Sequence, residues 1–139
     1  MIAVNTNKTY VVSGEDRQRL LETMLAEVGL SEKVEVVVCS EYVWQFGKRV
    51  GAKVLYRGVR SWEQDGKAER YLEWLNTIGP ITIGKTMPIP TYYLGGNPAF
   101  QNASSTLLRA RAINGEEVSE LVPPGCAAAV LQLYGKKST

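Results

Sequence analysis

Short apolar runs alternate with helical patterns from the first residues onward. The run Ile2-Ala3-Val4 gives way to polar residues at Asn5, which is typical of a buried strand that ends in a loop. Ser13 then offers a helix N-cap, and the apolar residues after it recur at helical spacing until Gly29. The start of the chain therefore predicts a strand followed by an amphipathic helix.

The alternation continues through the rest of the chain. Further strands are expected at 34–38, 54–56 and 91–94, and further helices at 42–50, 67–76, 104–113 and 118–131. We expect a loop at 57–60, a helix end at Gly79-Pro80, and a break or restart of the last helix at Pro123-Pro124. Alternating strands and helices of this length predict an α/β protein, with a parallel sheet covered by helices on both faces.

The size of the chain, 139 residues and 15.3 kDa, suits one compact domain over 1–139. The absence of histidine excludes a Ser-His-Asp triad and any histidine-ligated metal site. Sixteen basic against fourteen acidic residues leave a formal charge of +2, too small for the overall basic field of a nucleic-acid-binding protein. We therefore expect no nucleic-acid partner and only a local anion site.

The cysteines and the chain start indicate the compartment. Cys39 and Cys126 lie far apart and outside any C-x-x-C pair, so we expect no structural zinc site and interpret both as small buried residues. The first residues lack the long apolar run of a secretory signal, and no segment approaches the roughly 18 apolar residues of a membrane span. The expectation is a cytoplasmic protein with no membrane partner.

Two arginines follow the third predicted strand. Arg57 and Arg60 flank Gly58, so this loop can bring two cations and an unobstructed backbone to the edge of the sheet where ligands bind. The alternative is surface ion pairing with nearby carboxylates, namely Glu63, Asp65 or Glu69. Lys8, in the loop after the first strand, adds a cation, with plain solvent exposure as its alternative.

Three hydroxyl residues, Ser104, Ser105 and Thr106, open a predicted helix. Hydroxyls, unpaired backbone N–H groups and the positive end of the helix dipole together suit an anion, whereas plain N-capping is the alternative. Taken with Lys8 and the two arginines, this helix start favours a polyphosphate substrate. Phosphoryl and nucleotidyl transfers depend largely on positioning and charge neutralisation, so a chain without histidine can carry them.

Three motifs, in order and spacing, resemble phosphopantetheine adenylyltransferases of the bacterial type. V-L-Y-R-G-V-R at 54–60 matches the family's R-G-(L/V)-R strand end, and A-S-S-T-L-L-R at 103–109 matches its I-S-S-(S/T)-x-(V/L)-(K/R) helix start. V-S-E-L-V-P-P at 118–124 matches V-x-x-(L/F)-(V/L)-P-x, and E-D-R at 15–17 looks like the family's E-E-R. The resemblance covers essentially the whole chain.

The resemblance implies a Rossmann-like nucleotidyltransferase that transfers AMP from ATP to 4′-phosphopantetheine. The products are dephospho-CoA and pyrophosphate, so dephospho-CoA and CoA are expected ligands. Mg²⁺ would accompany the ATP without a protein metal cluster. Because the family is often hexameric, a homo-oligomer is expected.

The same resemblance assigns roles to individual residues. Lys8 and Arg60 would be catalytic. The residues expected to bind ATP are Arg57, Gly58, Arg60, Glu69, Ser104, Ser105 and Thr106. The residues expected to bind 4′-phosphopantetheine are Lys8, Val43, Arg57 and Asn76, with Val43 along the pantetheine arm.

The chain departs from the family pattern in two ways. Segment 61–76 is one residue longer, so Glu69 and Asn76 match only if the extra residue lies between Arg60 and Asp65. The chain also contains neither the family's opening strand nor its G-(T/S)-F-D-P-x-(T/H)-x-G-H loop, whose histidine stabilises the transition state. In the family's 3-2-1-4-5 sheet the missing strand is central, so two strand edges would lack partners.

We therefore expect a chain truncated at its N-terminus relative to the family, or a gap closed by segment 81–89 or by a strand of a neighbouring chain. Activity is expected to be impaired, because losing one charge-stabilising group costs about 10²–10³-fold. One alternative is a non-catalytic nucleotide or CoA-binding module. Another is an α/β assembly domain in which the arginines are ion-paired.

Overall fold

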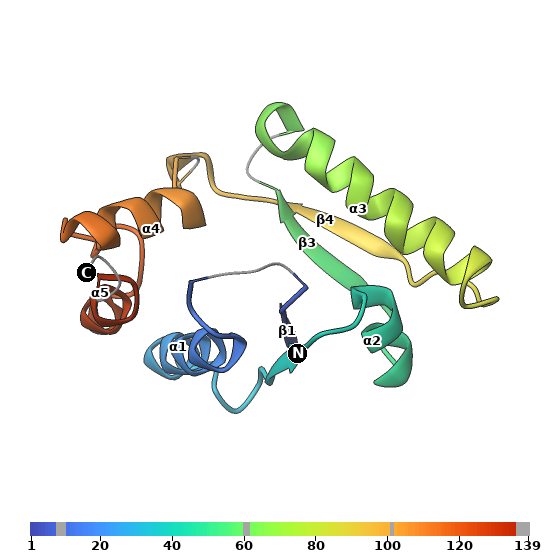
Figure 1. Ribbon diagram of the computed structural model, residues 1–139, viewed down its shortest axis with the longest axis horizontal. Helices are drawn as coiled ribbons and strands as arrows, with labels where there is room; N and C mark the ends of the chain where they lie inside the picture. The colour runs from blue at the N-terminus through green and yellow to red at the C-terminus, as the bar shows by residue number, and fades with distance from the viewer. Residues whose placement is uncertain (8–10, 60–61, 101, 136–139) are drawn as a thin grey trace. The chain divides into compact units, whose positions relative to one another are not determined.

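The computed structural model describes residues 1–7, 11–59, 62–100 and 102–135, which form parallel strands alternating with helices (Figure 1). The elements are β1 (Ile2–Asn5), α1 (Gly14–Glu27), β2 (Val36–Cys39), α2 (Val43–Arg49), β3 (Leu55–Val59), α3 (Trp62–Thr82), β4 (Thr91–Gly95), η1 (Pro98–Phe100), α4 (Ser105–Asn114), η2 (Pro124–Cys126) and α5 (Ala127–Gly135). They divide into two compact units, Met1–Ser40 with Ala103–Thr139, and Glu41–Asn102. The α/β class expected from the sequence is confirmed.

A parallel strand pair and the helix that joins its strands begin the first unit. β1 pairs with β2 along its whole length, and α1 connects them. Ser13 is the N-cap of α1, as expected, because its hydroxyl accepts the backbone N–H of Asp16 at 3.0 Å. Gly14 starts the helix so close to the sheet that a Cβ there would lie 2.6 Å from the Thr6 side chain. Only glycine fits this approach without a shift of the helix.

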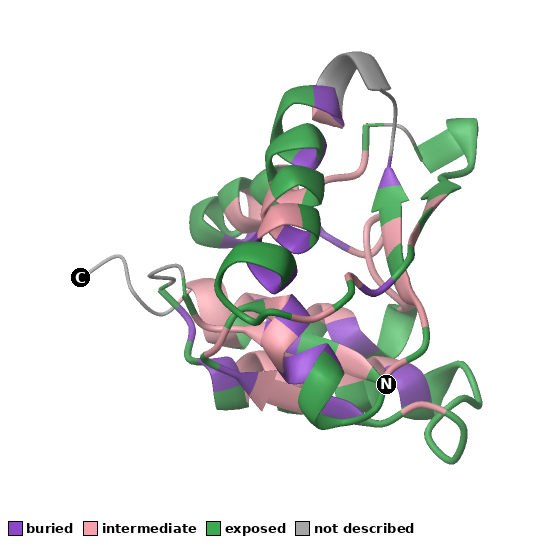
Figure 2. Ribbon diagram, turned by 90° about the vertical axis from the view of Figure 1, so that its right-hand side faces the viewer, coloured by how far each residue is buried: buried purple, intermediate pink, exposed green. Residues whose placement is uncertain are grey.

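α1 packs on two sides. Toward the sheet, Leu25 packs against Val4 and Val36. A second cluster joins α1 to the C-terminal part of the chain, and its buried members are Leu20, Ala112, Val118 and Val130. α1 therefore covers the β1–β2 pair on one side and packs against the C-terminal part of the chain, α4 and α5, on the other. Buried and exposed residues alternate along helices that pack in this way (Figure 2).

In the second unit, α3 lies along one face of the parallel β3–β4 pair (Figure 1). Because side chains alternate across a strand, Arg57 points to the same face as Leu55 and Val59. The residues of the opposite face, Tyr56, Tyr92 and Leu94, are exposed. This strand pair is thus covered by its own helix on one side.

α3 is longer than the sequence predicted. The expectation that Gly79-Pro80 ends the helix is wrong, since α3 runs to Thr82 with Pro80 inside it. Pro80 is fully buried, and its carbonyl accepts the backbone N–H of Thr86 at 3.0 Å. Burial therefore carries the helix past a residue that lacks an N–H donor. Among the described residues, no helix has the length and apolar character needed to cross a membrane.

Two other boundaries differ from expectation. β3 extends to Val59, so Arg57 and Gly58 lie in a strand rather than in the loop predicted at 57–60. The ladder continues because the Val59 carbonyl accepts the backbone N–H of Gly96 at 2.9 Å. The helix predicted from 118 is also wrong in its first half, where turns precede η2 and α5. Helical structure resumes only at the proline pair.

The four strands form two two-stranded parallel sheets, β1–β2 and β3–β4. Each strand has one strand partner within the described part of the chain. Segment 81–89, considered from the sequence as a possible further strand, contains the end of α3 followed by turns and irregular backbone. That hypothesis for segment 81–89 is therefore wrong.

Both cysteines are free and buried, as the sequence predicted. The Cys126 thiol donates to Glu27 Oε2 at 3.3 Å, and the Gly125 backbone N–H donates to Oε1 at 2.9 Å. Burial raises the pKa of the Cys126 thiol, and the hydrogen bond to Glu27 and its charge act in the same direction. The end of α1 is therefore tied to η2 through one carboxylate.

A methyl group at position 79 is expected to destabilise the second unit. A Cβ on Gly79 would lie 2.8 Å from Trp44 Nε1, and Trp44 is buried on α2. Overpacking of about 1–3 kcal/mol outweighs the roughly 1 kcal/mol that alanine gains over glycine in a helix. We expect Gly79→Ala to lower the free energy of unfolding in urea by about 1 kcal/mol. Gly95→Ala, where a Cβ would meet nothing within 4 Å, is the control, and a Gly79→Ala protein at least as stable as wild type would contradict this packing.

Candidate functional site

The second unit brings together Arg57 on β3 and Glu69 on α3. Arg57 Nη2 donates to Glu69 Oε1 at 3.0 Å, and Nε donates to Oε2. The two side chains are 27% and 11% exposed, so this bidentate pair is largely removed from water. The sequence alternative that Arg57 pairs with a nearby carboxylate is confirmed for Glu69.

The pairing leaves part of the Arg57 guanidinium unused by Glu69. A guanidinium carries five N–H donors, and the carboxylate takes two of them along one edge, on Nε and Nη2. The hydrogen bond to Glu69 raises the pKa of Arg57 above its ordinary value, while burial acts in the opposite direction. Arg57 therefore stays charged and can hold Glu69 on one edge while it presents other N–H groups to an anion.

Two buried polar residues mark one face of α3. Glu69 and Asn76 are both buried and lie two helical turns apart, so they share a side of the helix. Glutamate and asparagine are mostly exposed in proteins, and burial of both on one face is unusual. Val43, the first residue of α2, is half-buried, and α2 packs against α3. Of the expected site residues that the structure describes, the second unit thus contains Val43, Arg57, Gly58, Glu69 and Asn76.

The start of α4, in the first unit, carries the three hydroxyl residues. Ser104 is the N-cap, with its hydroxyl accepting the Leu107 backbone N–H at 3.1 Å, so the capping interpretation is confirmed for this residue. Ser105 and Thr106 are exposed in the first turn, and the Thr106 hydroxyl accepts a hydrogen bond from Arg109 at 3.3 Å. The cap needs only Ser104, so Ser105 and Thr106 remain candidates for anion binding.

The remaining expected residues divide between described and undescribed positions. Gly58 lies inside β3, where a Cβ would meet nothing within 4 Å, so its backbone is open to a ligand. Lys8 and Arg60 lie outside the described residues. Among the residues that the structure describes, no three His, Cys, Asp or Glu side chains gather as a possible metal site.

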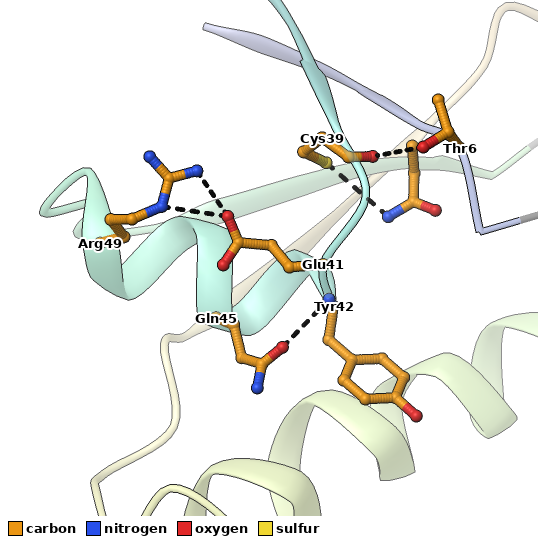
Figure 3. A network of polar contacts seen from close by, with 7 residues as sticks. Thr6, Cys39, Glu41, Tyr42, Gln45 and Arg49 are labelled. Carbon is orange, nitrogen blue, oxygen red and sulfur yellow. Dashed lines mark hydrogen bonds and ion pairs between the residues drawn. The ribbon is translucent and has the colours of Figure 1, made fainter.

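A second arginine–glutamate pair, beside α2, offers a contrast with Arg57 and Glu69. Arg49 Nε donates to Glu41 Oε1 at 3.0 Å, and the side chains are 63% and 31% exposed (Figure 3). The same figure shows Gln45 accepting the Tyr42 backbone N–H at 3.3 Å at the start of the helix. Exposed pairs of this kind contribute little to stability. Arg57–Glu69 and Arg49–Glu41 are thus chemically similar pairs in different surroundings.

Sequence reasoning missed Tyr93 on β4. It lies directly opposite Arg57 in the β3–β4 register, so the two side chains share a face of the strand pair. The third strand and the fourth were both predicted, but their register was not, and only the register places this tyrosine beside the arginine.

Comparison with known proteins finds relatives that match almost the whole chain. The phosphopantetheine adenylyltransferase of Latilactobacillus sakei subsp. sakei is 31% identical over 133 residues, which cover 94% of this chain and 74% of the relative. Those of Caulobacter vibrioides and Beijerinckia indica are 27% identical over 135 residues and 29% identical over 133 residues, covering 97% and 94% of this chain and 78% and 75% of the relatives. No family model matches the chain. The chain belongs to the phosphopantetheine adenylyltransferase family.

Membership of the phosphopantetheine adenylyltransferase family confirms the resemblance drawn from the three motifs. It places the chain among nucleotidyltransferases of coenzyme A biosynthesis. The R-G-V-R and S-S-T motifs thus have a family context; the structure describes Arg57 with Glu69 in the second unit and the start of α4 in the first unit.

Removing the charge of Glu69 is expected to cost more stability than removing that of Glu41. Glu69→Gln leaves the largely buried Arg57 guanidinium without a charged partner, and we expect a loss of about 1–3 kcal/mol in the free energy of unfolding. Glu41→Gln breaks the exposed pair and is expected to cost less than about 1 kcal/mol. Urea denaturation of both variants makes the comparison, and equal losses would show that burial does not distinguish the two pairs.

Alanine substitutions of the three hydroxyl residues at the start of α4 are expected to differ in how much they destabilise the protein. Ser104→Ala removes the cap and is expected to destabilise the protein by about 1 kcal/mol. Ser105→Ala and Thr106→Ala leave the cap in place and are expected to change stability by no more than about 0.5 kcal/mol. Thermal and urea unfolding of the three variants check this order, which fails if Ser105→Ala costs as much as Ser104→Ala.

Proposed function

We propose that this chain transfers the adenylyl group of ATP to 4′-phosphopantetheine. A phosphate oxygen of 4′-phosphopantetheine attacks the α-phosphorus of ATP, the bond to the β-phosphate oxygen breaks, and dephospho-CoA and pyrophosphate leave. Family membership at 31% identity over 94% of the chain supports this reaction. The observation that carries the proposal is the Arg57 guanidinium, held along one edge by Glu69 on α3.

Arg57 suits this reaction because its orientation is set before substrate binds. An exposed arginine loses side-chain entropy when it captures a phosphate, whereas a tethered one has already lost it. In the proposal, Arg57 binds phosphate oxygens through the N–H groups that Glu69 does not use. The open backbone of Gly58, next to it on β3, allows close approach of the ligand.

The other residues have roles that the family resemblance suggests. Lys8 and Arg60 are proposed to neutralise charge at the reacting phosphates, and the exposed Ser105 and Thr106 at the start of α4 to bind ATP phosphates. Mg²⁺, accompanying the ATP, would supply further charge neutralisation at the phosphates. Each of these groups stabilises developing negative charge, and none needs to act as a general base.

Val43 and Asn76 are proposed to bind the pantetheine part. An amide in the buried position of Asn76 can bond the amide groups of a pantetheine arm, and the half-buried Val43 offers an apolar wall. A Rossmann-like nucleotidyltransferase architecture and assembly into a homo-oligomer belong to the same proposal.

Pyrophosphate release tests the reaction directly. With ATP, Mg²⁺ and 4′-phosphopantetheine, the chain is expected to release pyrophosphate in a coupled assay and to bind ATP in calorimetry. Arg57→Ala is expected to weaken ATP binding by about 1.5–3 kcal/mol, because it removes a charge-assisted hydrogen bond to phosphate. Arg49→Ala, which removes an exposed ion-paired arginine of the same unit, is the matched control and is expected to leave ATP affinity unchanged.

Three other outcomes would redirect the proposal. Binding of ATP and CoA without pyrophosphate release would favour the non-catalytic binding module, an alternative that the absence of histidine from this chain keeps open. Equal ATP affinity of wild type and Arg57→Ala would count against a phosphate contact at Arg57. Neither binding nor turnover would favour the assembly domain.

A further inference from the structure

α3 lies on the β3–β4 pair with one side and turns its other side away from the strands (Figure 1). On that other side Tyr71, Trp74 and Ile81 are 62%, 57% and 52% exposed, and Ile78 is half-buried. Successive residues turn about 100° around a helix, so these four lie opposite Glu69, which meets Arg57 of β3. Helix sides that face water are normally polar, and an exposed apolar stripe indicates a surface that meets a partner. We name these four residues the α3 stripe.

The spacing of the α3 stripe is that of a coiled-coil seam. Steps of three, four and three residues place Tyr71 and Ile78 at the a positions of a heptad, and Trp74 and Ile81 at the d positions. In an antiparallel helix pair, each a residue faces a d residue of the other helix. A two-fold axis near residue 76 therefore sets Trp74 against Ile78 of a second copy, and Tyr71 against Ile81 of that copy.

The side-chain volumes along the α3 stripe are self-complementary in this antiparallel register. Every layer joins one large aromatic ring to one isoleucine, whereas a parallel register would set Trp74 against Trp74 and Tyr71 against Tyr71 and overfill those layers. The rings of Tyr71 and Trp74 already stack, with centroids 6.5 Å apart and 25° between their planes. Because the two rings are ordered before association, less side-chain entropy is lost when they are covered.

The charges beside the α3 stripe favour the same orientation. Arg70 is exposed next to the N-terminal end of the stripe, and the last turn of α3 contains no basic residue. Antiparallel pairing brings Arg70 close to the C-terminal carbonyl groups of the other α3, which carry partial negative charge. Parallel pairing would instead place the Arg70 side chains of both copies at the same end.

We propose that the α3 stripe is an interface between two copies of this chain, with their α3 helices antiparallel about a two-fold axis near residue 76. A fully buried aromatic side chain covers about 150–250 Å², so the two half-exposed rings and two isoleucines supply on the order of 400 Å² per copy. A standard interface covers about 800 Å² per partner, so this contact alone is expected to hold a dimer at micromolar affinity or weaker. The inference rests on the homo-oligomer named in the proposed function and assigns it a surface, but it does not depend on adenylyl transfer.

The experiment compares Trp74→Glu with wild type by sedimentation velocity, without ligand, over a series of protein concentrations. The substitution puts a carboxylate into the centre of the stripe, opposite an apolar side chain of the other copy. We expect the dissociation constant of the dimer to rise at least about 100-fold, because each dimer would bury two unpaired charges. At concentrations where the wild-type pair forms, the variant is expected to sediment with half the wild-type mass. Phe100→Glu, the same change at an aromatic residue of this unit that is 61% exposed outside α3, is the matched control and is expected to sediment like wild type.

A charge-reversal pair tests the register. Ile78→Lys alone is expected to weaken the dimer, as Trp74→Glu does. Both substitutions in one chain set a carboxylate opposite an ammonium group in two layers of the antiparallel pair, and we expect the dissociation constant to return to within about tenfold of wild type. In a parallel pair the same double variant would bring like charges together in both layers and would not recover.

Four results would overturn the interface. They are a wild-type chain that stays monomeric at its highest soluble concentration, an unchanged mass for Trp74→Glu, an equal effect of Phe100→Glu, and a double variant that does not recover. If the first unit of the same chain covers the stripe, Trp74→Glu lowers the free energy of unfolding and leaves the mass unchanged, which also overturns it. Ile81→Glu gives the same reading if Trp74→Glu is poorly folded by circular dichroism. All masses are measured without ATP, so a failure of the proposed reaction leaves this reading intact.

Discussion

A charged pair between a strand and a helix constrains the second unit. The Glu69 carboxylate is 11% exposed, and a carboxylate left that far from water without a partner costs several kcal/mol. α3 can therefore pack on the β3–β4 pair only with Arg57 opposite Glu69. A shift of β3 by one residue would turn Arg57 to the exposed face and place Tyr56 against the helix. The ion pair thus fixes both the face of the strand and the direction of the guanidinium.

The same pair limits how strongly Arg57 alone can attract an anion. At an effective dielectric constant of about 20, a phosphate charge 4 Å from the guanidinium gains about 4 kcal/mol. The Glu69 carboxylate, about 7 Å from such a phosphate, takes back about 2 kcal/mol. The net attraction that remains orients a bound phosphate more than it strengthens the binding of that phosphate. A polyphosphate site at Arg57 therefore needs further cationic groups, and the family resemblance suggests Lys8 and Arg60 as candidates.

Local patterns predicted the order of strands and helices well, because capping residues and apolar spacing act within a few residues. Ser13 illustrates this, since it caps the helix that its sequence position indicated, and one of the three hydroxyl residues before the fourth helix, Ser104, caps that helix. The end of α3 could not be read in this way, because burial of Pro80 against distant residues outweighs its helix-breaking chemistry. The sequence pattern predicts Arg57 in a loop because it does not show that β3 pairs with β4 as far as Val59. The position of Tyr93 opposite Arg57 depends on that same pairing, which no pattern within either strand reveals.

A two-stranded sheet is only marginally stable by itself, so the stability of each sheet in this protein depends on the helices packed against it. In the first unit α1 supplies that support, and its second side is buried against residues more than eighty positions away, Ala112, Val118 and Val130. The Glu27 carboxylate adds hydrogen bonds to Gly125 and Cys126 across a similar separation. Closing so long a loop costs entropy that only the completed cluster recovers. The start of α4, with Ser104 to Thr106, is consequently ordered by the packing of the C-terminal helix on α1. The position of this helix start is therefore a product of long-range packing, although its sequence motif is entirely local.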